Sequence, residues 1–284
     1  MRFLPALCLI ALSACAAPSE GNAPEAEPAK VADQPARDVP PLDAVEGRWR
    51  VVSIDGEALP DTFADGQVPQ LSLASDHVGG NIGCNSFGAL ALYADGRFAT
   101  HSWSGTAMYC TGLAEQEQAL SELFFEHPAL ARQGDRLSIR SARHEAVLDY
   151  LGPPADASFN PASQQLSGTR WRIRFLDRSE ASSSPQDRFL SFTDDGWRGL
   201  ASCATLFGTY RRAGNRLMVD DEIANTEQLC PPEYAAQDDA FAALMRSDPR
   251  YLIGPNGELI IAGGGHMLTG GRTQDTEGNS TGKQ

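Results

Sequence analysis

The sequence predicts an α+β protein with two tandem domains, each a mostly antiparallel β-sheet packed by one amphipathic helix. Three observations support this fold class: an internal repeat covers most of the chain, short apolar runs are separated by turn residues, and each half contains one stretch with helical periodicity. The chain of 284 residues is 42% hydrophobic, which is enough for ordinary globular cores, and its length suggests about two domains.

The first 14 residues resemble a bacterial lipoprotein signal peptide. One positive charge at Arg2 precedes an apolar stretch of about ten residues, whereas a membrane-spanning helix needs roughly 20. The segment Leu12-Ser13-Ala14-Cys15 resembles a lipobox, in which the cysteine receives diacylglycerol and becomes the new N-terminus after cleavage. We therefore expect Cys15 to be lipidated; the alternative is an ordinary signal peptide that contains a cysteine. Ala16 resembles the default signal that directs such proteins to the outer membrane, facing the periplasm.

Composition divides the rest of the chain into segments. Residues 15–46 contain the expected lipidated cysteine and a disordered tether rich in Ala, Pro and acidic residues, which cannot bury a core. The predicted segments after the tether are a first domain at 47–152, a linker at 153–167, a second domain at 168–272 and a disordered tail at 273–284.

The charge of the chain bears on its partners. The formal net charge is −14. Such an acidic chain repels phosphate backbones, so we expect no nucleic-acid binding. It also repels anionic lipid head groups, so we expect the membrane to be contacted through the lipid at Cys15 and not through further surface adhesion.

The repeat is visible in the first strand and in the cysteines. Trp49 and Trp171 lie in similar segments, 122 residues apart. Once Cys8 leaves with the signal peptide and Cys15 is lipidated, four cysteines remain, which favours disulfides in an exported chain and allows three connectivities. They form two pairs with internal spacings of 26 and 27 residues. Because repeated units fold as units, we predict the disulfides Cys84–Cys110 and Cys203–Cys230.

Turn and helix signals give the order of elements in each half. Hairpins are expected at 89–101 around Ala94-Asp95-Gly96, at 251–261 around Asn256-Gly257, and at the turn Asp194-Asp195-Gly196. Helical periodicity follows each second cysteine, over 115–125 in the first half and after Pro231-Pro232 in the second. Each predicted helix presents an apolar face to its sheet.

These features resemble the META domain family, found in HslJ-like bacterial lipoproteins. The first half carries the opening Trp49, the segment Gly83-Cys84-Asn85-Ser86-Phe87-Gly88 and the segment Thr106-Ala107-Met108-Tyr109-Cys110. The second half is degenerate: it keeps Trp171, Cys203, Gly208, Thr226 and Cys230, but has Ser202-Cys203-Ala204 for the first motif and Gln228 in place of Met108. The resemblance implies two tandem copies of a small envelope domain linked to stress response.

Several residues carry alternative interpretations. Cys84 with His77 or His101 as its base would make a reactive cysteine, but an exported cysteine with a matching partner is more typical of a disulfide. We therefore predict no catalytic residue, and the histidine spacing predicts no metal site and no cofactor. Trp103 and Trp197 are candidates for a ligand groove, although core or cross-strand packing is the favoured interpretation.

Two glycine-rich stretches are also interpreted structurally. Gly79 to Gly83 predicts a turn that enters a strand, because it lacks the lysine of a phosphate-binding loop. The segment Gly263-Gly264-Gly265-His266 predicts a strand edge or a bulge.

Together the sequence favours a non-catalytic, lipid-anchored cell-envelope lipoprotein with a binding role or a role in envelope stress. Its expected partner is an envelope protein or an apolar ligand. The alternative is a carrier that encloses an apolar small ligand or lipid between sheet and helix, and the third hypothesis is an envelope enzyme. A closed and filled core in both domains would count against the carrier.

Overall fold

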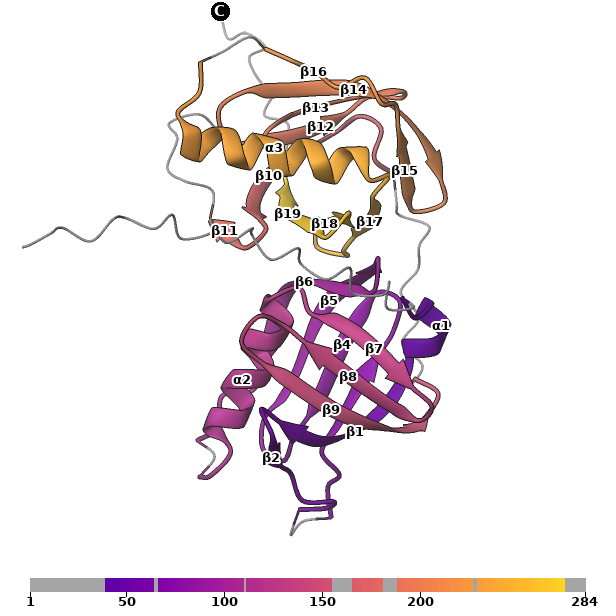
Figure 1. Ribbon diagram of the computed structural model, residues 1–284, viewed down its shortest axis with the longest axis vertical. Helices are drawn as coiled ribbons and strands as arrows, with labels where there is room; N and C mark the ends of the chain where they lie inside the picture. Colours follow the sequence, from indigo (N-terminus) through magenta and orange to yellow (C-terminus); the bar gives the residue numbers. More distant parts are fainter. Residues whose placement is uncertain are drawn as a thin grey trace, which may run out of the picture. The chain divides into compact units, whose positions relative to one another are not determined.

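The structure is a computed structural model that describes residues 39–63, 66–109, 111–154, 165–180, 188–226 and 229–273 (Figure 1). The predicted signal peptide, Cys15, Cys110, Gln228, most of the linker and nearly all of the tail lie outside these residues. Within the described ranges, no helix combines the length and the hydropathy needed to cross a membrane.

The first domain is an antiparallel sheet that closes on itself. The strand order is β2-β1-β3-β4-β5-β6-β7-β8-β9, and β1 also pairs with β9, so both edges of β1 are occupied. Its elements are α1 (Leu42–Val45), β1 (Gly47–Ile54), β2 (Glu57–Ala58), β3 (Gln70–Leu73), β4 (His77–Asn81), β5 (Ser86–Ala94), β6 (Arg97–Gly105), α2 (Ala114–Phe125), β7 (Ala129–Gln133), β8 (Arg136–Arg140) and β9 (Glu145–Gly152).

The second domain repeats this topology. The path β11-β10-β12-β13-β14-β15-β17-β18-β19 is closed by pairing of β10 with β19, and β16 pairs with β14. Its elements are β10 (Thr169–Leu176), β11 (Ser179–Glu180), β12 (Phe189–Phe192), β13 (Gly196–Leu200), β14 (Thr205–Ala213), β15 (Arg216–Val219), β16 (Ala224–Asn225), α3 (Pro232–Arg246), β17 (Arg250–Ile253), β18 (Glu258–Gly263) and β19 (His266–Arg272).

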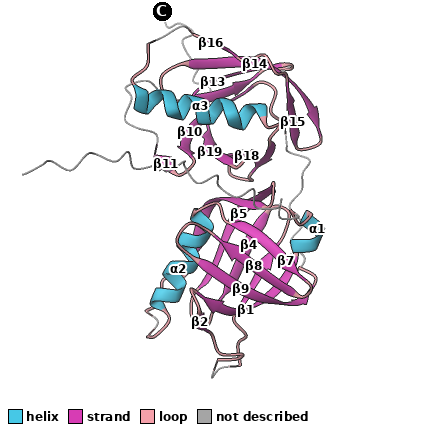
Figure 2. Cartoon of the chain, in the orientation of Figure 1, coloured by secondary structure: helices cyan, strands magenta, loops and turns pink. Residues whose placement is uncertain are grey.

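Two tandem, mostly antiparallel domains agree with the predicted fold class, and the three expected hairpins are present as β5–β6, β12–β13 and β17–β18. The predicted helices correspond to α2 and α3, drawn as the two long helices in Figure 2. The prediction missed two features. Each sheet is closed and barrel-like, and the first domain has the short helix α1 in addition to α2.

Side chains fill the interior of both closed sheets. Trp49 and Trp171 are fully buried, one in each core, and their indole nitrogens donate to the Val45 carbonyl at 3.0 Å and to the Thr169 hydroxyl at 2.8 Å. Each helix adds buried residues to its own core: Ala119, Leu120, Leu123 and Phe124 from α2, and Phe241, Ala242, Leu244 and Met245 from α3. Such packing stabilises the fold, since truncation of a buried aromatic side chain to alanine costs about 3–5 kcal/mol.

Both interpretations of the glycine-rich stretches were right only in part. Ile82 and Gly83 lie in the bend that leads into β5, but Gly79 and Gly80 lie inside strand β4, where Gly80 pairs with Leu71 on one side and Phe87 on the other. Gly264 and Gly265 form a two-residue hairpin turn between β18 and β19, with φ of 59° and 82°, which is the left-handed pair that a tight hairpin requires. A glycine-rich stretch is compatible both with a turn and with a strand that approaches another backbone closely. The sequence pattern alone did not distinguish these two roles.

A small polar network joins α2 to the turn after β1. The Nδ1 atom of His144 lies 2.7 Å from an Asp55 carboxylate oxygen, and its Nε2 atom lies 3.2 Å from Glu122 on α2. Asp55 also accepts the backbone N–H of Glu145 at 2.9 Å. The hydrogen bond that His144 donates to the Asp55 carboxylate is the main cause that raises the pKa of His144, against the opposing effect of desolvation.

Gly80→Ala should destabilise the first domain by about 1–3 kcal/mol, the usual cost of overpacking. A Cβ atom at this position would meet the Gln70 carbonyl oxygen at 2.3 Å and a Leu71 methyl at 2.8 Å. Gly88→Ala is the matched control in the adjacent strand, because its Cβ would meet only the Val78 carbonyl oxygen at 3.8 Å. Thermal unfolding of both variants measures the difference, and equal midpoints would contradict the strand assignment.

The His144 network should stabilise the first domain more at pH 6.5 and just below than at a pH above the raised pKa of His144. A histidine whose folded pKa is raised contributes stability that is fully present below its unfolded pKa and is lost as pH rises through the folded pKa. In His144→Gln, the unfolding midpoint should change less with pH in this range. Asp55→Asn should also weaken this pH dependence while it keeps the hydrogen bond from the Glu145 N–H. An unchanged pH dependence in both variants would contradict the role given to His144.

Candidate functional site

The first family motif forms a hydrogen-bonded hub at Asn85, between β4 and β5. Its backbone N–H and its side-chain amide each donate to one carboxylate oxygen of Glu117 on α2, both at 2.7 Å. Its amide also donates to the Met108 carbonyl at 3.0 Å. The side-chain oxygen accepts the Met108 N–H at 2.8 Å and the Thr106 hydroxyl at 2.9 Å. Asn85 therefore fastens the loop after β6 and the start of α2 to the motif loop.

Thr106 makes the second link, and the repeat preserves it. Its hydroxyl accepts the Ser86 N–H at 3.1 Å, and its own N–H donates to the Ser86 carbonyl at 3.0 Å. Thr226 has the same two bonds to Thr205, at 3.1 and 3.0 Å. The threonine predicted from the motif thus serves one structural purpose in both domains.

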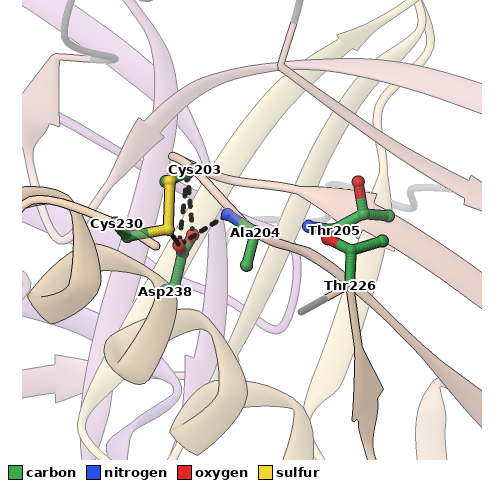
Figure 3. Close-up of a disulfide and its surroundings, with 6 residues drawn as sticks. All are labelled: Cys203, Ala204, Thr205, Thr226, Cys230 and Asp238. Carbon is green, nitrogen blue, oxygen red and sulfur yellow. Dashed lines mark hydrogen bonds between the residues drawn. A yellow bond between two sulfur atoms is a disulfide. The ribbon is translucent and has the colours of Figure 1, made fainter. Parts of the chain in front are cut away.

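The second domain replaces the asparagine hub with a carboxylate from its helix. Ala204 stands where Asn85 stands in the first domain, and Asp238 on α3 accepts the backbone N–H of Ala204 at 2.8 Å and that of Cys203 at 3.2 Å (Figure 3). Burial raises the pKa of Asp238, and the backbone donors partly offset this effect. Glu117 and Asp238 therefore correspond: each helix supplies an acid that accepts the N–H following the first cysteine.

Sequence reasoning missed these two acids. The available signal was an acidic residue on each predicted helix, seven residues after Cys110 and eight after Cys230. Because acidic residues are common in the first turns of helices, that signal alone does not identify a hydrogen-bond partner 32 or 34 residues earlier in the chain.

The cysteines are oxidised where the structure describes them. Cys203 and Cys230 form a disulfide with a Cα–Cα distance of 5.9 Å (Figure 3). Cys84 is disulfide-bonded as well. Since Cys203 and Cys230 are joined to each other, neither is the partner of Cys84, and its predicted partner Cys110 lies outside the described residues. Both first cysteines lie in bends between strands.

The disulfides also bear on catalysis and metal binding. The Cys84 sulfur is not a free thiolate, and His77 is engaged with Asp76 at 2.7 Å. Among the described residues, the group of side chains close enough to share a metal ion is Cys203, Cys230 and Asp238. Its two sulfurs are bonded to each other, so this group lacks the thiolates that bind zinc.

The glycines of the motif are explained by close contacts. Gly83 has φ of 122°, and a Cβ atom there would meet the Phe63 ring at 2.3 Å. Gly208 pairs with Trp197, and a Cβ atom there would meet the indole nitrogen at 3.1 Å. Gly88 lies in β5, opposite Gly79 and Ser104. Met108, in contrast, is 58% exposed, and its backbone N–H and carbonyl bond to the Asn85 side chain.

The two candidate groove tryptophans differ. Trp197 is 3% exposed and belongs to the second core, as the favoured interpretation predicts. Trp103 is partly buried, stacks on Phe87 with ring centroids 4.6 Å apart, and lines a hollow of about 240 Å³ with residues of the Asn85 hub. The hub residues on its rim already bond to one another, so the hollow offers mainly the aromatic pair to a ligand.

The disulfide pattern is directly testable. Peptide mapping of the unreduced protein should yield one peptide pair that joins residue 203 to 230 and another that joins 84 to 110. Cys230→Ser should destabilise mainly the second domain, by about 2–5 kcal/mol. A peptide that joins residue 84 to 203 or 230 would refute the two-domain pairing.

Comparison with known proteins agrees with the repeated geometry. The family model of the META domain matches the chain twice, at residues 42–151 and 164–275. No curated protein matches the chain. Two NMR structures match single-domain lengths: one is 19% identical with a TM-score of 0.33, covering 37% of this chain and 89% of its own. The other, from Burkholderia xenovorans, is 20% identical with a TM-score of 0.35, and the match covers 44% of this chain and 95% of that one.

A third match is a DNA polymerase sliding clamp from Pseudomonas aeruginosa, 8% identical with a TM-score of 0.21, covering 74% of this chain and 57% of that one. All three TM-scores are too low to support an argument about function. The two family-model matches together span more than half of the sequence. The chain therefore belongs to the META domain family and carries two tandem copies of the domain.

Proposed function

We propose that this protein is a non-catalytic, lipid-anchored lipoprotein of the cell envelope, with a binding role linked to envelope stress. The proposal that the protein is non-catalytic rests on the Asn85 hub. Every polar group of the Asn85 side chain is engaged within the protein, with Glu117, Thr106 and Met108. A catalytic asparagine or cysteine needs groups that are free to contact a substrate, whereas these residues hold loops together.

The anchoring part rests on the lipobox-like segment that ends at Cys15 and on the tether that follows. Three acyl chains on one cysteine give firm attachment, because each buried methylene contributes about 0.8 kcal/mol and two chains already suffice for stable anchoring. Outer-membrane placement facing the periplasm follows from Ala16. The disulfide at Cys203 and Cys230 is consistent with an oxidising compartment.

The carrier alternative is less favoured. It requires an apolar cavity inside the sheet, but Trp49, Trp171, Phe98 and Phe241 are fully buried in the two cores. The hollow beside Trp103 lies between the motif loop and α2, and its volume is below the roughly 300–1,000 Å³ that is usual for small-molecule sites. A binding role on the outer surface is therefore the better proposal.

Cys15→Ser tests the anchor. The variant should accumulate as an unprocessed precursor and take up no radioactive palmitate, whereas the wild type should be cleaved and labelled. The wild-type protein should also fractionate with membranes and be released by detergent. Cleavage of the variant together with an unlabelled wild type would refute the lipid anchor and leave an ordinary secreted protein.

A further inference from the structure

The group formed by Cys203, Cys230 and Asp238 brings together three parts of the second domain. Cys203 lies in the bend between β13 and β14, Cys230 lies in the loop before α3, and Asp238 lies in α3. Two sulfur atoms and one carboxylate oxygen of this group lie within 4.8 Å of one another. The Cys230 sulfur is 4.0 Å from Oδ2 of Asp238 (Figure 3).

The spacing of these atoms is close to that of a tetrahedral zinc site. Zn–S bonds of about 2.3 Å and Zn–O bonds of about 2.1 Å place a sulfur and an oxygen ligand roughly 3.6 Å apart, and two sulfur ligands roughly 3.8 Å apart. The distance from the Cys230 sulfur to Asp238 is already within about 0.5 Å of this value. The two sulfurs have to separate, because a disulfide holds them about 2.05 Å apart. With Cα atoms 5.9 Å apart, rotation of the two reduced side chains supplies this separation.

Backbone N–H groups of the bend orient the Asp238 carboxylate beside the sulfurs. Ala204 donates to it at 2.8 Å and Cys203 at 3.2 Å, and the Ser202 N–H is a further donor. A carboxylate has about four lone-pair sites, so three donors leave capacity for a cation. Carboxylates that bind metal ions are themselves hydrogen-bonded, which fixes their orientation. The bend therefore supplies the outer partners that such a ligand needs.

The donor atoms determine which metal the reduced group suits. Thiolates are soft ligands that select zinc over magnesium or calcium, and zinc also accepts a carboxylate oxygen. Cys203 and Cys230 are partly exposed, and Leu229 beside Cys230 is fully exposed, so a reductant, a metal ion and a water ligand can approach from the loop. The sequence prediction of no metal site considered histidine spacing, and this group contains no histidine.

We propose that the second domain forms a zinc site when the Cys203–Cys230 disulfide is reduced. A dithiol reductant transfers two electrons to the S–S bond: its own two sulfurs become a disulfide, and its two protons pass to the Cys203 and Cys230 sulfurs. Zn²⁺ then displaces these two protons into solvent and binds both thiolates and one Asp238 oxygen, with water as the fourth ligand. The loop before α3 is thus held to the bend by the disulfide in one redox state and by the metal in the other.

Zinc binding by the full chain tests the proposal. The parent chain carries Cys8→Ser and Cys15→Ser, so that its remaining cysteines are the four of the two domains. It is reduced with a phosphine, because a dithiol would itself bind zinc, and is then dialysed without oxygen against buffered Zn²⁺. Zinc per chain is measured by elemental mass spectrometry. The reduced parent should bind zinc, and the oxidised parent should bind at least one ion fewer per chain.

Two double variants locate the metal. Cys203→Ser with Cys230→Ser should bind one zinc ion fewer per chain than the reduced parent, whereas Cys84→Ser with Cys110→Ser should keep that ion. Co²⁺ in place of zinc gives a spectroscopic check. Charge-transfer absorption from thiolate to cobalt should be present in the second double variant, which retains only the thiolates of the proposed site. Equal zinc contents in the two double variants, or no such absorption, would overturn the proposal.

Asp238→Asn tests the third ligand. The variant keeps the shape of the side chain and should weaken zinc binding by at least about tenfold, because loss of even an outer partner costs about 10–100-fold in metal affinity. Asp239→Asn is the matched control, since it changes the adjacent, exposed acid of α3 and should leave the affinity unchanged. Far-UV circular dichroism of the reduced, zinc-bound chains should show the folded spectrum. Equal affinity in the parent and Asp238→Asn would overturn the proposal, as would a reduced parent that binds no zinc or binds it only when unfolded.

Discussion

The first strand of each domain is paired along both of its edges, and the rest of each domain depends on this constraint. Strand β1 bonds to β3 and β9, and β10 bonds to β12 and β19. Closure gives the sheet an inside and an outside, so the alternation of residues along this strand decides which side chains form the core. Trp49 and Trp171 face inward for this reason, and the arginines beside them face outward.

The helices are held to the closed sheets by more than apolar packing. Glu117 and Asp238 each accept a backbone N–H from the bend that contains the first cysteine. A bend between strands leaves backbone donors that need partners when they are removed from water. The helix supplies these partners, so the position of the helix and the conformation of the bend stabilise each other.

This arrangement explains how the second copy tolerates the loss of its asparagine. In the first domain Asn85 bridges Glu117 and the loop at Met108. In the second, the carboxylate of Asp238 binds the bend directly, and Thr226 keeps its bonds to Thr205. The motif residues are thus parts of a support for the fold, which is why the motif by itself does not point to a reaction.

Net charge describes the chain as a whole and not the arrangement of charges on its surface. The acidic total predicts repulsion from anionic head groups, and this stays a prediction. In the first domain Asp149 and Glu145 form ion pairs with the outward arginines Arg50 and Arg140. A sum over the chain contains no information about which charges lie side by side, and the interaction with a surface depends on that arrangement.

The sequence by itself determined the two copies, the hairpins at Asp95-Gly96 and Asn256-Gly257, the positions of α2 and α3 and the pairing of Cys203 with Cys230. These follow from local periodicity, turn chemistry and repeat spacing. Only the tertiary structure decided the closure of each sheet, the strand role of Gly79 and Gly80 and the acids that bind the cysteine bends. Each of these depends on residues that are far apart in sequence and meet only through strand register, which no local pattern specifies.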